Sequence, residues 1–578
     1  MISISSHTRT SETTLLSRLS KTAKGTNGVT FVGSAAGTEG KQSTSWNHLY
    51  HEARTAAAVL QKRGIVPGDN IALLGLTSRP LITAIQGTWL AGGCVNMLPI
   101  PMRMNSMAEF INQTRAQVAY ADIKILLIDP SLASFYETQA GDPPLMLLDE
   151  LLSEAGSCTE SDYRAVDDDL DRLAILQLTS GSTSVPKGVM LPQRVICNNI
   201  DAMDEVVKLS MDDDVLVSWL PLYHDMGLIG ILATSMLKGC NLVLAAPQDF
   251  LSSPGDWMRW MSDYGGTITA GPNFSYVLAT RALRRMTDSK EQLDLSRVRM
   301  ALNGAEPIDP DAMDKFMAAA AKHGFRPGAE FTAFGMAEVT IAGTFPPIMR
   351  GMVCDHVDRR ALETVKTARP SEPGQPETRR LPLLGRPVPG LEMRICDPAS
   401  GKVQEERKVG ELQIRGSSVT PGYYKQPELT ETLFQDGWLR TGDLGYFVPG
   451  PENGLPELVI CGRLKDVIIV AGRNIYPEDI ERVTGEIEEV RPGNVIAFGL
   501  DSGKGKETVV VVAETKAPEQ ADQDDICKKI RYRVLNTCAI KPKDIILVQK
   551  GSLPKTSSGK LQRSLCKQQY KNNQLQPL

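Results

Sequence analysis

Short apolar runs alternate with longer amphipathic segments through the first half of the chain. Residues 70–75 (NIALLG) and 123–129 (IKILLID) predict buried strands, whereas residues 78–92 and 106–117 carry apolar positions at helical spacing. Further strand-like runs lie at residues 94–100, 215–218, 241–245 and 298–303. Because short buried strands separated by helices form parallel sheets covered by helices, this pattern predicts an α/β fold.

The pattern changes twice toward the C-terminus. Residues 346–384 include the tract TARPSEPGQPETRR, which fits neither period and predicts a long, partly irregular insert. Strand-like segments rich in Gly and Pro follow, at residues 391–395 and 410–415. Beyond residue 462 the chain shows strand-like runs at 467–470, 494–498 and 509–512 and helix-like runs at 477–484 and 524–535. We therefore predict a large N-terminal domain of helix-covered sheets, residues 1–464, and a small C-terminal α/β domain, residues 465–578.

Composition narrows the class of protein. The 578 residues are 42% hydrophobic and 23% charged, as in an ordinary globular protein, and the net charge of −5 argues against a nucleic-acid-binding protein. The first ten residues, MISISSHTRT, contain no apolar segment typical of a signal peptide, and the most apolar run, residues 226–237, is too short to span a bilayer. The ten cysteines are scattered without a C-x-x-C pair, which argues against a zinc site or a disulfide framework. We expect a cytoplasmic protein without a transmembrane segment.

The strongest chemical signal is a polar loop after a strand-like run, in residues 176–190 (LQLTSGSTSVPKGVM). Small hydroxyl residues around a glycine let backbone and side-chain donors approach an anion, and Lys187 adds a positive charge suited to phosphate. The spacing is not that of a Walker loop. Taken alone, the segment is equally consistent with a polar surface loop.

Three further clusters carry candidate chemistry. His224 stands beside Asp225, a pairing suited to acid–base chemistry, although a histidine packed at the end of an apolar strand is at least as common. Phe334 offers a ring face to a planar base, or simply belongs to the core, and Glu338 offers a hard oxygen to Mg²⁺. Asp443 follows a predicted turn, where a carboxylate can accept from the two hydroxyls of a ribose.

The last cluster is near the C-terminus. The segment 553–560 (LPKTSSGK) places Lys560 on a tip rich in Gly and Ser. Alone, such a tip is typical of a solvated surface.

Together, and in this order between about residues 45 and 563, the motifs resemble the acyl-adenylate-forming superfamily, which includes acyl-CoA synthetases, fatty-acyl-AMP ligases, firefly luciferases and the adenylation domains of peptide synthetases. The resemblance implies an ATP-binding protein of two domains that hinge at Lys465 and Asp466. It implies that Lys560 bridges the substrate carboxylate and the α-phosphate, that Phe334 stacks on adenine, that Asp443 binds the ribose and that Arg463 lies near ribose and phosphate.

The resemblance also implies a complete set of site residues. Catalytic roles fall to Lys560, His224 and Glu338, of which Glu338 also binds Mg²⁺. The implied nucleotide-binding residues are Thr179, Ser180, Gly181, Ser182, Thr183, Lys187, Asn303, Gly304, Ala305, Glu306, Phe334, Gly335, Met336, Asp443 and Arg463.

This sequence departs from the superfamily pattern at two positions. Ser184 replaces the glycine usual after Thr183, so we expect a less mobile loop. Phe334 replaces the commoner tyrosine, which keeps the stacking surface and loses one hydroxyl. Neither change removes a charged catalytic group, so activity is expected.

Two features favour the fatty-acyl-AMP ligase branch. Residues 220–230 read LPLYHDMGLIG, a form similar to that of the branch, and 47 positions separate Glu338 from Gly385, enough for the insert that this branch carries between its domains. The resemblance therefore implies an ATP- and Mg²⁺-dependent activation of a fatty acid, whose acyl group passes to the phosphopantetheine thiol of an acyl carrier protein. The alternatives are a fatty-acyl-CoA synthetase with an unusual insert, a non-catalytic adenylate- or lipid-binding relative and, more distantly, a luciferase-type oxygenase. We expect CoA to be a poor or an alternative acceptor.

Overall fold

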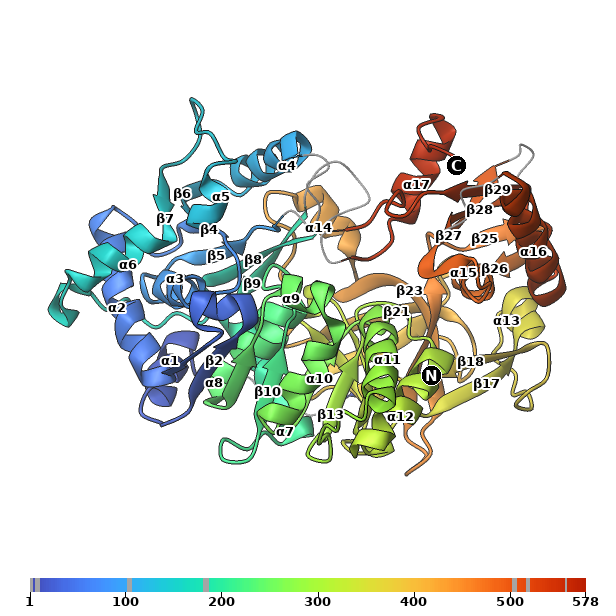
Figure 1. Ribbon diagram of the computed structural model, residues 1–578, viewed down its shortest axis with the longest axis horizontal. Coiled ribbons are helices and arrows are strands. Elements are labelled where there is room, and N and C mark those ends of the chain that lie inside the picture. The colour runs from blue at the N-terminus through green and yellow to red at the C-terminus, as the bar shows by residue number, and fades with distance from the viewer. Residues whose placement is uncertain are drawn as a thin grey trace.

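The computed structural model describes residues 4–5, 11–100, 107–179, 187–501, 507–515, 520–556 and 559–578. The elements in these ranges are helices and strands in several sheets (Figure 1). This confirms the predicted α/β class. Among the described residues, no helix is both long and apolar enough to cross a bilayer.

The first sheet is formed by the N-terminal part of the chain, and its strands are parallel except for the last. Its order is β7 (Leu145–Leu147), β6 (Ile123–Ile128), β4 (Asn70–Leu74), β5 (Cys94–Met97), β8 (Leu173–Thr179) and β9 (Lys187–Pro192). Helices that flank it and pack on one another are α2 (Trp46–Lys62), α3 (Arg79–Leu90) and α6 (Leu148–Gly156). Residues 78–92 and 123–129 thus form the predicted helix and strand, while the strand expected at 94–100 already ends at Met97.

A second sheet carries the elements that lead to the candidate site. Its order is β14 (Glu330–Thr332), β13 (Met300–Asn303), β12 (Ile268–Gly271), β10 (Val215–Ser218), β11 (Asn241–Leu244), β2 (Gly28–Val32) and β3 (Lys41–Ser45), with only the β2–β3 pair antiparallel among these. Its neighbouring helices include α10 (Pro254–Asp263), α11 (Asn273–Asp288) and α12 (Pro310–Ala320). Because the strands run parallel, the loops after β10, β12, β13 and β14 leave the same edge of the sheet.

A third, antiparallel sheet follows the insert. It runs β1 (Ile4–Ser5), β20 (Leu391–Cys396), β21 (Gly410–Gly416), β23 (Trp438–Pro449) and β22 (Phe434–Gln435), and β24 (Pro456–Arg463) also pairs with β23. A short ladder of β15 (Phe334–Gly335), β16 (Ala342–Phe345) and β19 (Arg386–Pro387) lies before it in the chain. These strands belong largely to one extended apolar core that also includes the first two sheets.

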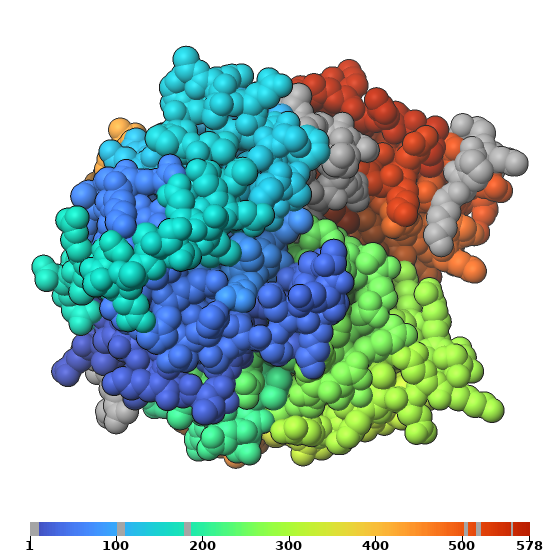
Figure 2. All heavy atoms as spheres, turned by 60° about the vertical axis from the view of Figure 1, so that its left-hand side comes forward, coloured from blue at the N-terminus to red at the C-terminus, as the bar shows by residue number. Residues whose placement is uncertain are grey.

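The C-terminal residues form a separate set of elements (Figure 1). They are the hairpin of β25 (Ile468–Val470) and β26 (Arg473–Ile475), the sheet β27 (Val490–Asp501), β28 (Glu507–Thr515) and β29 (Asp544–Val548), and helices α15 (Pro477–Gly485), α16 (Gln520–Cys538) and α17 (Arg563–Lys571). Two apolar clusters of their own fill this part, one around Ile480 and Val511, the other around Phe498 and Val512. In the space-filling view of Figure 2 these residues, coloured orange to red, lie at one corner of the molecule.

The insert has more regular structure than the sequence predicts. Its strands β17 (Cys354–Asp358) and β18 (Thr378–Pro382) form an antiparallel hairpin that encloses helix α13 (Arg359–Val365). The expectation that residues 367–380 fit no regular element is therefore wrong for their last three residues, which belong to β18. Apolar insert residues pack with β23, β24 and Tyr476 in a single cluster, and α13 lies against β26 (Figure 1).

Candidate active site

The polar loop begins at the end of β8. Ser180, Gly181, Ser182, Thr183 and Ser184 lie outside the described residues. The strands that flank them are paired, with Thr179 opposite Lys187. The Lys187 ammonium lies 5.3 Å from the centre of the Tyr423 ring. Tyr423 also binds Glu338, so the Lys187 end of the loop lies close to Glu338.

Glu338 and Tyr423 are joined across 85 positions of sequence. The Tyr423 hydroxyl donates to Glu338 Oε1 at 2.7 Å, and the Thr420 N–H donates to the Glu338 carbonyl at 2.9 Å. The Tyr423 hydroxyl therefore fixes the orientation of the Glu338 carboxylate through one of its two oxygens. Nothing in the local sequence indicates Tyr423, because the pairing depends on how two distant segments meet.

The segment before Glu338 forms a wall of the site. Phe334 and Gly335 lie in β15 opposite β16, and Met336 packs against the main core. A Cβ atom on Gly335 would lie 1.8 Å from the Ile341 carbonyl oxygen, so only glycine fits there. Phe334 is half-buried and packs against this core, which leaves part of its ring accessible.

Asp443 lies on β23 directly opposite Arg463 on β24. Arg463 Nε donates to Asp443 Oδ1 at 3.1 Å, and the Asp443 N–H donates to Thr441 Oγ1 at 3.0 Å. Burial raises the pKa of the Asp443 carboxyl, although Arg463 opposes the shift. The Arg463 side chain remains 55% exposed and can therefore approach a ligand.

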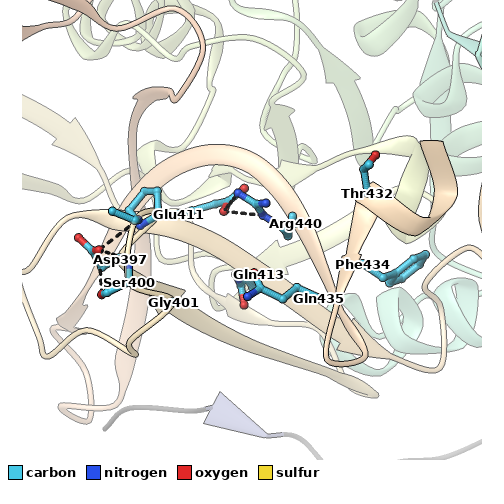
Figure 3. A pocket seen from close by; sticks show the side chains of 11 residues that line it. Asp397, Ser400, Gly401, Glu411, Gln413, Thr432, Phe434, Gln435 and Arg440 are labelled. Atoms are coloured by element: carbon cyan, nitrogen blue, oxygen red, sulfur yellow. Dashed lines mark hydrogen bonds and ion pairs between the residues drawn. The ribbon is translucent and has the colours of Figure 1, made fainter. Parts of the chain in front are cut away.

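Glu411, which the sequence does not single out, supports the turn before Asp443. It accepts from the Gly442 N–H at 3.3 Å and pairs with Arg440 at 2.9 Å. Figure 3 shows this pair at the side of a cavity of about 420 Å³, which none of the predicted site residues lines. Glu411 therefore binds the turn through Gly442 and also lines, with Arg440, a cavity outside the predicted site.

Asn303, Gly304, Ala305 and Glu306 continue from β13. Asn303 is buried and its Nδ2 donates to Asn273 Oδ1 at 3.3 Å, and Ala305 adopts a φ of +70°. Gly304 would bring a Cβ atom to 3.1 Å from the Ala333 carbonyl oxygen, so the backbones are close here. Glu306 Oε1 accepts from the Phe274 N–H at 2.7 Å. Of these four residues, Glu306 is the one whose side chain lies near Lys560.

His224 and Asp225 follow β10 at the start of a buried π-helix, η4 (Met226–Ala233). His224 Nδ1 lies 2.6 Å from Asp225 Oδ1. Burial disfavours the charged form of Asp225, but His224 and then Lys560 outweigh burial and lower the pKa of this carboxyl. The apolar run 226–237 is largely buried and therefore belongs to the core, and it follows the His224–Asp225 pair in the chain.

Lys560 lies near charged residues that come from several of these elements. Its loop is closed by the Gln562 N–H bond to the Pro554 carbonyl at 3.0 Å and by the Lys560 N–H bond to Thr556 Oγ1 at 3.1 Å. Burial lowers the pKa of the Lys560 ammonium, and the carboxyl groups that oppose this shift are Asp225, Glu306 and Asp443. The predicted catalytic lysine therefore lies among residues from three separate segments of the chain. Lys465, near Arg463, Lys187 and Asp443, adds a further cation.

The described residues suit a Mg²⁺ ion that is shared with phosphates. Among them, no group of three or more His, Cys, Asp or Glu side chains forms a metal cage. Mg²⁺ is commonly bound by one or two carboxylates together with substrate phosphates, and Glu338 is one oriented carboxylate close to Asp443 and Arg463.

Known proteins are similar to this chain over most of its length. The profile of the AMP-binding enzyme family matches residues 19–424, and that of the Disco-interacting protein 2-like AMP domain matches residues 465–578. A Mycobacterium tuberculosis protein named as a ligase, Rv1013, is 37% identical over 523 residues, which cover 90% of this chain and 93% of the relative.

Two further relatives are informative. The medium-chain-fatty-acid–[acyl-carrier-protein] ligase JamA of Moorena producens is 30% identical over 545 residues, 91% of this chain and 90% of the relative. A solved structure from a study of fatty acyl-adenylate ligases of E. coli and L. pneumophila superposes with a TM-score of 0.89 at 27% identity, covering 98% of this chain and 99% of the other. The chain therefore belongs to the AMP-binding enzymes, the acyl-adenylate-forming superfamily.

Proposed function

We propose that this protein is a fatty-acyl-AMP ligase, which joins a fatty acid to AMP from ATP and releases pyrophosphate. The observation that carries the proposal is the position of Lys560, which is buried near Asp225, Glu306 and the Asp443–Arg463 pair. The similarity to JamA and to the solved fatty acyl-adenylate ligase supports a fatty acid as the substrate.

The reaction is a displacement at phosphorus. A carboxylate oxygen attacks the α-phosphorus of ATP, an O–P bond forms, the bond to the β-phosphate oxygen breaks and pyrophosphate leaves. Negative charge develops on the oxygens around the α-phosphorus, so the protein mainly orients the reactants and supplies positive charge. Lys560 provides that charge between carboxylate and phosphate, and Asp443 accepts hydrogen bonds from the ribose.

The remaining site residues take supporting roles. Residues 179–183 and Lys187 bind the phosphates, while Asn303, Gly304, Ala305, Glu306, Phe334, Gly335 and Met336 form the walls around nucleotide and lysine. Glu338, oriented by Tyr423, holds Mg²⁺, which supplies charge neutralisation to the phosphates when bound. His224, paired with Asp225, faces the entering carboxylate.

The acceptor is the thiol of an acyl carrier protein. Its sulfur attacks the acyl carbon, the C–S bond forms, the bond from the acyl carbon to the phosphate oxygen breaks, AMP leaves and the thiol proton passes to water. This second reaction requires Lys560 to withdraw, so we place a hinge at Lys465 and Asp466 between residues 1–464 and residues 465–578. The name of JamA, an [acyl-carrier-protein] ligase, supports this acceptor.

The insert would restrain this hinge. Glu363 of α13 pairs with Arg473 of β26 at 2.5 Å, and Arg379 of β18 pairs with Asp479 of α15 at 2.9 Å. The insert therefore holds the C-terminal elements by two ion pairs in the pose that places Lys560 in the site. A carrier protein can offset such a bias with its own interface, whereas free CoA makes fewer contacts.

A product assay tests the function. The purified protein is incubated with ATP, Mg²⁺ and a series of fatty acids, alone, with CoA or with a holo-carrier protein, and the products are identified by mass. We expect acyl-AMP in every arm and acyl transfer in the carrier arm. Rapid acyl-CoA formation would favour the CoA synthetase, and binding of nucleotide without product would favour a non-catalytic relative.

A further inference from the structure

The loop that carries Lys560 rests on the large part of the chain at Phe274. Gly559 adopts a φ of +88°, and a Cβ atom there would lie 3.8 Å from Phe274 Cε1, so backbone and ring are neighbours. The Phe274 ring is set by its aromatic surroundings, because its centre lies 6.4 Å from those of both Trp219 and Phe250. Phe274 is thus a fixed surface for the loop.

Glu306 lies beside this contact. Its Oε1 accepts from the Phe274 N–H at 2.7 Å, which fixes the carboxylate next to the loop. Burial raises the pKa of the Glu306 carboxyl, and the Phe274 N–H, Lys560 and Lys555 oppose this shift. Lys555 is itself anchored, because its Nζ donates to Asn494 Oδ1 at 2.7 Å. Glu306 therefore lies near the lysines on either side of this loop.

The charges around Lys560 make Glu306 important for its placement. The charged groups that face Lys560 are Asp225, Glu306, Asp443 and Arg463. Asp443 and Asp225 each have a second cationic partner, Arg463 and His224, whereas the cations near Glu306 are Lys560 and Lys555. A buried ammonium without a partner is costly, so the loop needs a carboxylate to enter the site before any substrate binds.

We propose that Glu306 is a positioning residue for Lys560. The Glu306 carboxylate holds Gly559 and Lys560 against Phe274 in the pose that forms acyl-AMP. This rests on the proposed function in assigning Lys560 to the adenylation step. It gives Glu306 a role distinct from the nucleotide-binding role implied by the superfamily resemblance.

The variant Glu306→Gln tests this directly. The amide keeps an oxygen for the Phe274 N–H and loses the charge. Removing a negative neighbour lowers the pKa of Lys560, so the high-pH fall of acyl-AMP formation should move about one unit toward lower pH, with a roughly tenfold slower rate on that limb. Transfer from supplied acyl-AMP to a holo-carrier protein should slow less than acyl-AMP formation.

Two variants serve as controls. Glu306→Asp keeps the charge and should recover much of the pH profile. Glu330→Gln removes another buried glutamate of the large part, one that faces Arg380 and Asp314, and should keep the wild-type profile. A Glu306→Gln protein with the wild-type rate and pH profile overturns the proposal.

Hydrogen exchange makes the test independent of catalysis. Peptides that contain Gly559, Lys560 and Gln562 report on the amides that close the loop. We expect faster exchange in Glu306→Gln than in wild type or Glu330→Gln, without substrates present. Unchanged exchange overturns the positioning role, whereas faster exchange in a protein that makes no acyl-AMP supports the role and overturns the proposed function.

Discussion

Arg463 and Asp443 form an ion pair across two paired strands, with Arg463 Nε 3.1 Å from Asp443 Oδ1. Arg463 is only two positions before Lys465, where we place the hinge. The proposed ribose-binding pair and the proposed hinge are therefore neighbours in the chain. Binding of ATP at Asp443 is expected to influence which pose these elements adopt.

The first prediction concerns Asp443. In Asp443→Asn, loss of the carboxylate should weaken ATP binding by ~1.5–3 kcal/mol, because hydrogen bonds to a charged group are lost. Calorimetric titration with ATP and with 2′-deoxy-ATP measures this. The penalty for removing the 2′-hydroxyl should be smaller in the variant than in wild type, and equal penalties would show that Asp443 does not bind the ribose.

Lys560→Ala should leave ATP binding nearly intact but slow acyl-AMP formation by about 10²–10³-fold, the usual effect of removing one group that stabilises developing charge in a water-excluded site. Single-turnover measurement of acyl-AMP checks the rate. Lys567→Ala is a suitable control, because it removes a lysine from α17 outside the loop. Adenylation at the wild-type rate would remove Lys560 from the mechanism.

The third prediction concerns the contact between insert and hinge. Glu363 is 2% exposed and Arg473 is 25% exposed, so Arg473→Ala leaves a buried carboxylate without its closest partner and weakens this contact by about 1–3 kcal/mol. Acyl-CoA formation should then rise relative to acyl-AMP formation. Arg533→Ala breaks an exposed pair with Glu486 away from the insert and should not change the ratio. An unchanged ratio in Arg473→Ala would contradict the restraint.

This substitution is preferable to shortening the insert. Val357, Leu362 and Leu381 of the insert share an apolar cluster with Tyr446 and Val459 of the third sheet. Deleting the insert would expose that cluster to water, and a loss of stability would then obscure any effect on the acceptor.

The fourth prediction is a pH dependence of stability. Glu330 is 1% exposed, and burial, reinforced by Asp314 and opposed by Arg380, raises its pKa to about 8. The unfolded chain releases this proton near its ordinary pKa of about 4.3, so between these values the folded state holds more protons and the free energy of unfolding falls as pH rises. The contribution approaches ~1.4 kcal/mol per pH unit.

Glu330→Gln should remove this contribution, and the variant should gain stability relative to wild type from pH 5 toward about pH 8. Urea unfolding at several pH values measures the difference. Glu428→Gln, at an exposed position in α14 (Pro427–Leu433), is the matched control. A stability difference between Glu330→Gln and wild type that does not vary with pH would contradict the assignment.

Most helices and strands can be predicted from sequence, because the spacing of apolar residues within one short segment indicates the element. The run 215–218 is β10 residue for residue, while the helix expected at 524–535 extends to Gln520–Cys538. The sequence does not predict that residues 378–380, at the end of the Pro-rich tract, form a strand, and the reason is physical. Arg379 in β18 reads as a surface residue, but it is buried between Asp479 and the Tyr476 ring, partners about a hundred positions later.

The same limit applies to the site. Residues within a motif, such as His224 with Asp225, were accessible from sequence, whereas Tyr423 and Glu411 were not. Tyr423 meets Glu338 from 85 positions away, and Glu411 meets Gly442 from 31. Such pairs form only when strands distant in sequence become neighbours, and no period or spacing encodes them.

The burial of Tyr476 has a consequence for exchanging parts between relatives. Its ring lies 4.7 Å from the Arg379 guanidinium, and a Cβ atom on Gly462 would be 2.6 Å from its Cδ1. A chimera joined at residue 465 would set a foreign side chain into this tightly filled space. We expect a junction placed after Tyr476, with Arg379 and Tyr476 from one parent, to give a higher melting temperature than a junction at the hinge.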